Sequence, residues 1–249
     1  MAPTVVLLHG FTNTGASWEP VLAALGERYR AIAPDIRGHG SASRARPLTL
    51  DAVIGDVAVL TQDRFTLVGY SLGGRIALHA ALALRRRVER LVLIGASPGI
   101  ADPAQRAARR AADERLAAEI EAATIEEFAT RWAATPVLEG QSPEVKAAAH
   151  ADRLRSTPAG LAAALRGLGT GALPSLWERL GELSMPVVLI VGERDEKFRA
   201  IGQRMARELS RVELVVVADI GHAVHLEAPE RITAQLIGGE FTPARGADR

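Results

Sequence analysis

The chain of 249 residues contains no cysteine. Disulfides, thiolate metal sites and a cysteine nucleophile are therefore excluded. It also contains only two lysines, Lys146 and Lys197, so nearly all of its positive charge lies on arginine. Genomic base composition explains this bias as readily as function does. A single arginine therefore carries meaning only where its position in the chain supports it.

The sequence also lacks long runs of one kind. No apolar stretch approaches the ~20 residues of a membrane span, and the formal net charge is +1 with no long single-sign run. We therefore predict no membrane span and no nucleic-acid partner. Met1 is followed almost at once by an apolar run at residues 4–8, which leaves no room for a signal peptide, so we predict a cytoplasmic protein.

What is present is an alternation of strand-like and helix-like segments with no internal repeat. Apolar runs indicate strands, at residues 4–8, 30–33, 65–68, 91–94, 187–191 and 213–217. Segments with helical spacing separate them, at residues 18–27, 50–60, 72–84 and 198–209, and a last helix starts at Pro229. This order predicts an α/β fold with a mostly parallel sheet and helices on both faces. Ligands of such sheets bind at the carboxyl ends of the strands.

The alternation stops between residues 101 and 183, where only Ala-rich helical segments broken by Pro and Gly are found. A separate helical domain and a helical lid folded over the strand ends both fit this stretch. About 80 residues is small for an independent domain, and the alternation resumes afterwards, so we favour the lid. The expected organisation is a core at 1–100 and 184–241, a lid at 101–183 and a flexible tail at 242–249.

A G-x-S-x-G run, Gly69 to Gly73, lies between a predicted strand and a predicted helix. In that context the central residue, Ser71, sits on a strained turn with its side chain exposed at the sheet edge. A Cβ at either glycine would collide across the turn. The N–H of Leu72, at the helix start, points at negative charge developing beside Ser71. Ser71 is therefore the candidate reactive side chain.

A serine hydroxyl needs an imidazole and an orienting carboxylate to react at neutral pH. Asp195 and His222 follow later strands, so both should reach the edge where Ser71 emerges. His225 is the alternative histidine, and Glu193 and Glu196 are the alternative carboxylates.

A second N–H donor is expected in the loop after the first strand, where Gly10 lets the backbone approach and Phe11 offers its N–H. No two histidines lie at ligand spacing beside carboxylates on one predicted element, so we expect no metal and no cofactor.

These motifs together resemble the α/β-hydrolase fold over the whole chain. The stretches that carry the resemblance are His9-Gly10-Phe11, Asp35 to Ser41, Gly69 to Gly74, Gly192 to Asp195 and Gly221-His222.

A narrower resemblance is to the 2-succinyl-6-hydroxy-2,4-cyclohexadiene-1-carboxylate synthases of menaquinone biosynthesis. It rests on residues 11–15, Tyr70 to Arg75, residues 96–100, Phe128 to Trp132 and Leu154 to Ser156. The resemblance implies a lyase, whose triad removes a proton next to a ketone and expels pyruvate without an acyl-enzyme. It also implies a small polycarboxylate substrate, contacted by Arg75, Arg110, Arg155, Tyr70 and Trp132; Arg110 matches loosely because Arg109 is adjacent.

Arg75 lies one helical turn beyond Ser71, so the two share a helix face. A buried guanidinium needs a carboxylate partner, which is either a lid residue or an anionic substrate. A carboxylesterase or carbon-carbon bond hydrolase on the same scaffold is the main alternative function, and a non-catalytic ligand receptor is the second. The chain is expected to act as a monomer or a homodimer, between which the sequence does not choose.

Overall fold

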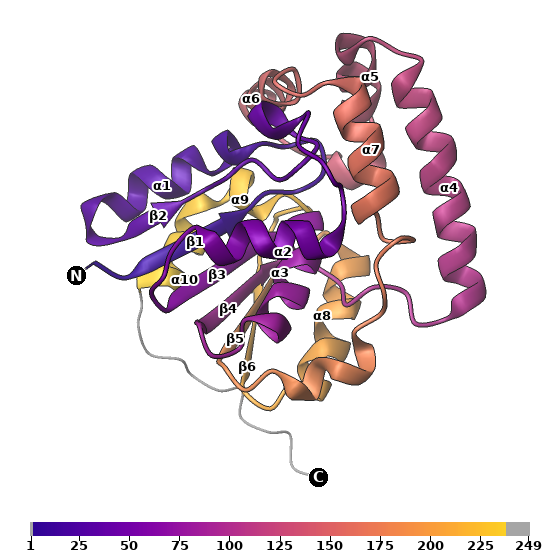
Figure 1. Cartoon of the computed structure of the whole chain (residues 1–249). Coiled ribbons are helices and arrows are strands. Elements are labelled where there is room, and N and C mark those ends of the chain that lie inside the picture. Colours follow the sequence, from indigo (N-terminus) through magenta and orange to yellow (C-terminus); the bar gives the residue numbers. More distant parts are fainter. Residues whose placement is uncertain (1, 238–249) are drawn as a thin grey trace.

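A computed structural model describes residues 2–237 of the chain (Figure 1). Its centre is a parallel sheet of six strands in the order β2-β1-β3-β4-β5-β6. The strands are β1 (Thr4–Leu8), β2 (Arg30–Ile32), β3 (Phe65–Tyr70), β4 (Val88–Ile94), β5 (Val187–Gly192) and β6 (Val212–Val217). The predicted parallel α/β sheet is confirmed, with each strand near its predicted place.

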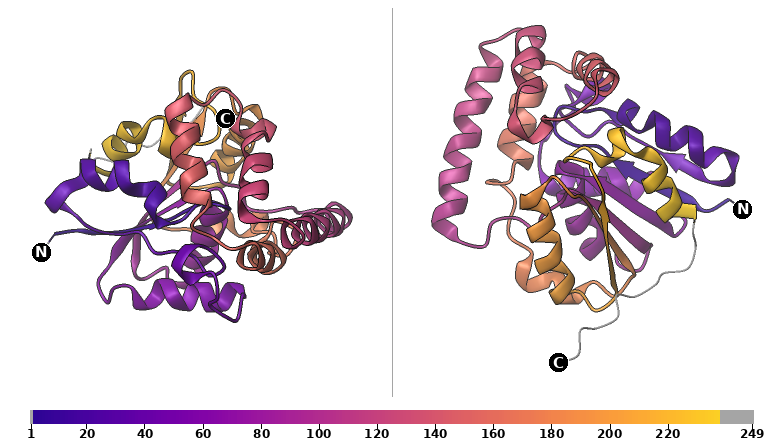
Figure 2. Two further views of the ribbon diagram at one scale, coloured as in Figure 1. Left: turned by 90° about the horizontal axis from the view of Figure 1, so that it is seen from above. Right: turned by 180° about the vertical axis from the view of Figure 1, so that it is seen from behind.

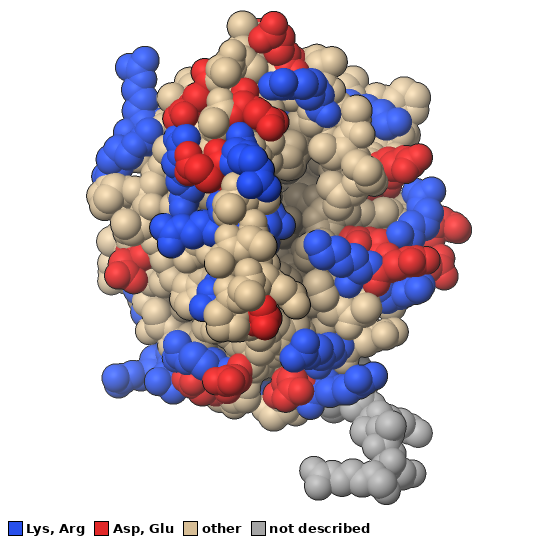
Figure 3. Space-filling view, turned by 90° about the vertical axis from the view of Figure 1, so that its right-hand side faces the viewer, with Lys and Arg blue, Asp and Glu red and all other residues tan. Residues whose placement is uncertain are grey.

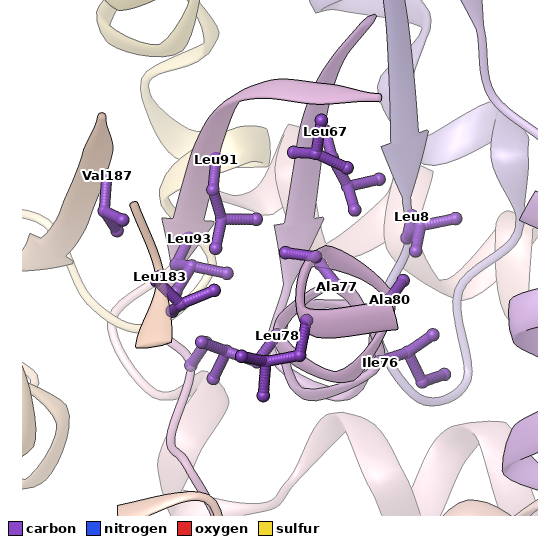
Figure 4. Packing of buried hydrophobic residues seen from close by; sticks show 14 of the residues in the cluster. Leu8, Leu67, Ile76, Ala77, Leu78, Ala80, Leu91, Leu93, Leu183 and Val187 are labelled. Atoms are coloured by element: carbon purple, nitrogen blue, oxygen red, sulfur yellow. The ribbon is translucent and has the colours of Figure 1, made fainter. Parts of the chain in front are cut away.

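The inner strands are largely apolar because both faces of the sheet are covered. In β1, Val6 and Leu8 point into one core and Val5 and Leu7 into the other, as the two-residue period of a strand requires. Figure 4 shows the first core, where leucines of the strands meet apolar side chains of a helix. Burial on both sides thereby fixes the register of the inner strands.

Helices cover both faces of the sheet (Figure 2). On one side lie α2 (Leu50–Val59), α3 (Leu72–Ala83) and α8 (Glu196–Glu208). On the other lie α1 (Glu19–Leu25), α9 (Val224–Glu227) and α10 (Pro229–Ile237). Short 3-10 turns occupy Gly15–Trp18, Gly26–Arg28, Gly40–Ala42, Pro136–Leu138 and Trp177–Glu182.

Between β4 and β5 the chain is helical and contains no strand, as predicted. The helices are α4 (Pro103–Glu121), α5 (Ile125–Ala133), α6 (Pro143–Arg153) and α7 (Pro158–Leu168). Each begins behind a capping side chain that accepts a backbone N–H, and three begin with proline, which suits the first helical position. Helices α4, α5 and α7 share a small apolar core of their own.

Element ends differ from the predicted ones by a few residues. Strand β4 starts at Val88 rather than Leu91, because its first part is only partly buried and tolerates Glu89 and Arg90. The predicted tail at 242–249 lies outside the described residues. None of the helices within residues 2–237 has the length and apolar character that a bilayer span requires.

Candidate active site

Ser71 occupies the sharp turn between β3 and α3. Its backbone has φ 51° and ψ −107°, a conformation that L side chains rarely adopt. The turn is held by the Ser71 N–H, which donates to the Ile94 carbonyl at 2.9 Å. A Cβ on Gly69 would lie 2.5 Å from the Gly73 carbonyl oxygen, and one on Gly73 would lie 2.2 Å from that of Leu8. The two glycines therefore permit the turn, as the motif predicted.

The structure brings Ser71, His222 and Asp195 together at the carboxyl edge of the sheet. His222 Nε2 lies 3.3 Å from Ser71 Oγ, and His222 Nδ1 lies 2.6 Å from Asp195 Oδ2. Asp195 also caps α8 by accepting the Phe198 N–H at 3.2 Å. The alternative carboxylates, Glu193 and Glu196, are exposed and make no hydrogen bond to His222. The carboxylate of Asp195, the imidazole of His222 and the hydroxyl of Ser71 thus form a chain along which a proton can be transferred.

The His222 ring is fixed by its neighbours as well as by Asp195. It lies between Tyr70 and Phe198, with ring centroids 5.2 and 4.5 Å away. Gly95, with φ 51°, lets it come close, since a Cβ there would be 2.8 Å from His222 Cε1. Sequence inspection missed Gly95, and its only signal was its place directly after a buried strand.

The other histidines near the site have different surroundings. His225 is fully buried between Trp18 and Tyr70, and neither ring nitrogen has a hydrogen-bond partner among residues 2–237. Burial, followed by the proximity of His222, lowers the pKa of His225 to about 3. His9 accepts the Ile36 N–H through Nε2 at 2.9 Å, so it joins the loop after β1 to the segment after β2.

Two backbone N–H groups beside the serine come from different elements. Leu72 begins α3 and so has no partner within that helix, while Phe11 follows β1. Within residues 2–237 neither N–H makes a hydrogen bond to another backbone or side-chain group. Both residues line the cavity beside Ser71. Two free donors in this position are suited to hold a developing oxyanion.

A cavity of about 330 Å³ opens beside Ser71, between the sheet edge and helices α4, α5, α7 and α8. Its polar lining includes Arg75, Arg109 and Lys197, and no Asp or Glu among the described residues lines it. The remaining walls are largely apolar, with Trp132 and Trp177 among them. The face in Figure 3 is hollowed near its centre, with blue Lys and Arg side chains at the rim of the hollow. The cavity is thus electrically positive.

Arg75 is the least compensated of these cations. Its Nε is buried without a hydrogen-bond partner, and no acidic side chain within residues 2–237 forms an ion pair with it. Burial, then the nearby charge of Arg109, lowers the pKa of Arg75 to about 10. The negative charge of Asp113 partly opposes this lowering of the Arg75 pKa, but Asp113 forms its ion pair with Arg109, at 2.6 Å. Of the two alternative partners for Arg75, a lid carboxylate is therefore not found within residues 2–237.

The structure corrects one arginine of α4. Arg109 lines the cavity, whereas Arg110, the predicted contact, does not. Consecutive residues of a helix point about 100° apart. The side that carries Asp113 and Leu116 faces the rest of the molecule, and Arg109 belongs to that side. Because the two arginines are adjacent, the match of Arg110 to the family's sequence pattern was only approximate.

A second correction concerns the end of α6. Arg155, the predicted contact, has a side chain 62% exposed and does not line the cavity with Arg75. Arg153, two residues earlier, is only 3% exposed and lines a small cavity beside Ser71. Tyr70 and Trp132 do lie at the site: Tyr70 is buried against His222, and Trp132 packs edge-on against Phe11 at 5.3 Å.

Residues 2–237 contain no group of three or more His, Asp or Glu side chains placed to hold a metal ion.

Comparison with known proteins adds a family to this geometry. The model of the alpha/beta hydrolase family matches residues 5–235. A Salmonella schwarzengrund 2-succinyl-6-hydroxy-2,4-cyclohexadiene-1-carboxylate synthase is 33% identical over 246 residues, 94% of this chain and 92% of that protein. A Bacillus subtilis protein provisionally given the same name is 35% identical over 235 residues, 90% of this chain and 85% of that protein.

The solved structure of MenH from S. aureus is similar throughout. It superposes with a TM-score of 0.90 and 30% sequence identity, over 96% of this chain and 93% of that one. The likeness therefore includes the helices between β4 and β5 as well as the sheet.

Proposed function

The chain belongs to the alpha/beta hydrolase family, and because its relatives there are 2-succinyl-6-hydroxy-2,4-cyclohexadiene-1-carboxylate synthases, we propose that it is such a synthase. It is then a lyase of menaquinone biosynthesis that releases pyruvate from 2-succinyl-5-enolpyruvyl-6-hydroxy-3-cyclohexene-1-carboxylate. The observation that supports this most directly is the positive cavity beside Ser71, in which Arg75 has no partner of its own.

The names of substrate and product define the bonds that change. The proton on C2, next to the succinyl ketone, is removed, and the electrons pass through an enolate. The ring double bond at C3 becomes a diene at C2 and C4, while the bond from C5 to the enolpyruvyl oxygen breaks. The oxygen leaves with the bonding electrons as the enolate of pyruvate, which takes up a proton. No water is consumed, so the reaction is an elimination.

The roles of the site residues follow from their geometry. His222, oriented by Asp195, accepts the hydroxyl proton of Ser71 and so makes its oxygen basic. Ser71 Oγ then takes the substrate proton rather than attacking carbon. The N–H groups of Phe11 and Leu72 stabilise the enolate oxygen in a partly desolvated site. Tyr70 and Trp132 form walls of the pocket, Tyr70 through its contact with His222.

The charge of the cavity indicates the class of substrate. An unpaired buried guanidinium is costly, and a bound carboxylate offsets that cost. Arg75 and Arg109 together can bind one carboxylate of a substrate with several negative charges. An uncharged ester has no group that would pair with them. The helices between β4 and β5 cover this cavity, which supports their role as a lid. The cytoplasmic location stays a prediction.

Two substrates offered in parallel test the proposal. The protein is incubated with the enolpyruvyl precursor and with a neutral nitrophenyl ester, and pyruvate and nitrophenol are followed. We expect pyruvate to form at a far higher specificity constant than nitrophenol, and Ser71→Ala to abolish both. Rapid nitrophenol release with no pyruvate would instead identify a carboxylesterase.

A further inference from the structure

Glu227, the last residue of α9, is a buried carboxylate that the proposed reaction does not use. Its side chain is 7% exposed, and its Oε1 has no hydrogen-bond partner among the described residues. Within residues 2–237 its one ion pair is long, with 3.8 Å between Oε2 and Nη2 of Arg194. Burying a carboxylate with so few partners is costly. Its place beside the loop of the catalytic histidine indicates what the charge does there.

The unpartnered oxygen of Glu227 lies against the loop that carries His222. A Cβ on Gly221, the residue before His222, would be 3.4 Å from Glu227 Oε1. Within residues 2–237 the backbone N–H groups of Gly221 and His222 make no hydrogen bond. These two residues are therefore held by contacts with other parts of the chain, and the Glu227 carboxylate is one of them.

The same loop touches the turn that leads to Asp195. A Cβ on Gly192, the last residue of β5, would lie 2.0 Å from the carbonyl oxygen of Gly221. The two backbones thus meet three residues before Asp195 and one residue before His222. A shift of either loop at this contact changes the distance between the carboxylate and the imidazole.

Arg194 joins the two loops to the helical insertion. Its backbone N–H donates to the carbonyl of Ile220 at 3.0 Å, while its guanidinium pairs with Glu227. On the insertion, a Cβ on Gly140, which has φ 82°, would be 3.3 Å from Arg194 Nη1. The pair of Arg194 and Glu227 therefore connects three segments of the chain around the catalytic histidine.

We propose that Glu227 is a positioning residue for His222. Its carboxylate supports the loop before His222, and its pairing with Arg194 holds that loop against the turn of Asp195. His222 Nδ1 is thereby kept 2.6 Å from Asp195 Oδ2. Glu227 lines neither cavity beside Ser71, so it acts through the histidine and not on the substrate. The proposal concerns the triad itself and holds for a lyase and for a hydrolase alike.

Four variants separate this role from a general contribution to folding. Glu227→Gln keeps the size of the side chain and removes its charge, so it tests the pairing without opening a cavity. Arg194→Ala removes the other member of the pair, and Arg194→Lys keeps the charge. Glu230→Gln, at an exposed carboxylate three residues further along, is the matched control. If Glu227 only stabilises the fold, Glu227→Gln lowers the melting temperature and leaves the hydrogen bond of His222 intact.

The first readout is proton NMR of the hydrogen bond between His222 and Asp195, which needs no substrate. The Nδ1–H of an imidazole bound to a carboxylate gives a low-field resonance, and its loss in His222→Ala assigns it. We expect Glu230→Gln to keep this resonance and Arg194→Lys to keep part of it. Glu227→Gln and Arg194→Ala should lose it by exchange with water, because His222 also lines an open cavity of about 550 Å³.

The second readout is turnover, measured well below the melting temperature on whichever of the two substrates above is converted. In Glu227→Gln we expect kcat to fall about tenfold to a hundredfold with KM nearly unchanged, because a misplaced imidazole slows the proton transfer and leaves the binding pocket intact. If the wild type shows no low-field resonance, kcat alone decides.

A wild-type kcat in Glu227→Gln would overturn the proposal, whether or not the resonance is retained. A raised KM with an unchanged kcat would overturn it as well, because Glu227 would then act on substrate binding. The proposed function fails separately. If the wild type releases nitrophenol and no pyruvate, the lyase is lost, while a lowered kcat of Glu227→Gln on the ester still supports the positioning role.

Discussion

At the scale of single residues, the site depends on a hydroxyl, an imidazole and a carboxylate that come from three separate turns after β3, β5 and β6. Ser71→Ala removes the oxygen that transfers the proton while leaving the glycine-supported turn in place. Turnover should fall by several orders of magnitude with little change in melting temperature. Steady-state rates and thermal melts check this, and near-normal turnover would remove Ser71 from the mechanism.

Two histidines three residues apart provide an internal control. His222→Ala should match Ser71→Ala, because the members of a triad act as a unit. His225→Phe should keep most of the activity, since His225 donates and accepts no hydrogen bond among the described residues and lies in an aromatic cluster. Measurements of kcat for the two variants side by side show which histidine is catalytic. The reverse pattern would mean that the catalytic histidine is His225.

Arg75→Ala should lower the specificity constant for the polycarboxylate by about 30-fold to several thousand-fold, because a desolvated charge pair worth about 2–5 kcal/mol is lost. Arg75→Lys should recover part of this, since it keeps the charge but loses the planar donor geometry. The activity on a neutral nitrophenyl ester should change little. An equal loss on both substrates, with a lowered melting temperature, would show that Arg75 has only a structural role.

The sequence predicted the site residues whose positions depend on neighbouring residues in the chain. It missed those whose positions depend on which side of a helix faces the cavity. Ser71 and its glycines were found because a tight turn constrains five consecutive residues. Arg109 and Arg153 were passed over for Arg110 and Arg155, because the side of an Ala-rich helix that faces the cavity depends on its neighbours.

At the scale of elements, Asp152 ties α6 to the loop after β1. Its Oδ1 accepts from Thr14 Oγ1 at 2.5 Å, and its Oδ2 accepts from the N–H of Thr14 at 2.9 Å and from Asn13 Nδ2 at 3.3 Å. The helical insertion is thus fastened to the loop that carries Phe11. Strand order and helix starts could be read from apolar runs and capping residues, but this contact spans 138 positions and could not.

Asp152→Ala should therefore lower both the stability of the folded chain and the rate of the reaction. Each buried group left without a partner costs about 1–3 kcal/mol, and Thr14 contributes two such groups. We expect a lowered midpoint in urea unfolding together with a lowered kcat, because the loop that carries Phe11 loses its support. Lys146→Ala, a change at an exposed residue of the same helix, is the matched control and should change neither. A wild-type kcat in Asp152→Ala would show that the contacts of Asp152 with the loop after β1 do not contribute to catalysis.

At the scale of the whole molecule, buried neutral histidines make stability depend on pH. Burial lowers the pKa of both His39 and His225 to about 3, against 6.5 for an ordinary histidine. Between these values the unfolded chain binds protons that the folded chain does not, so stability falls as the pH falls from about 7 to 4. Each histidine should contribute on the order of 1–2 kcal/mol at pH 5.

Urea unfolding at several pH values measures this dependence. His225→Phe, which removes one of the histidines with a lowered pKa, should show a shallower loss of stability below pH 6.5 than the wild type. An unchanged slope would mean that His225 is not neutral and buried in the folded chain.

The same fold and the same three side chains serve hydrolysis in esterases, so the central claim for the whole molecule is that this site eliminates without a covalent intermediate. The most direct measurement is a rapid-quench single turnover with the enolpyruvyl precursor, followed by intact-mass analysis of the protein and assay of pyruvate. We predict that pyruvate rises to one equivalent while the protein keeps its unmodified mass at every time point. An acyl adduct on Ser71 that forms and decays during the turnover would contradict it.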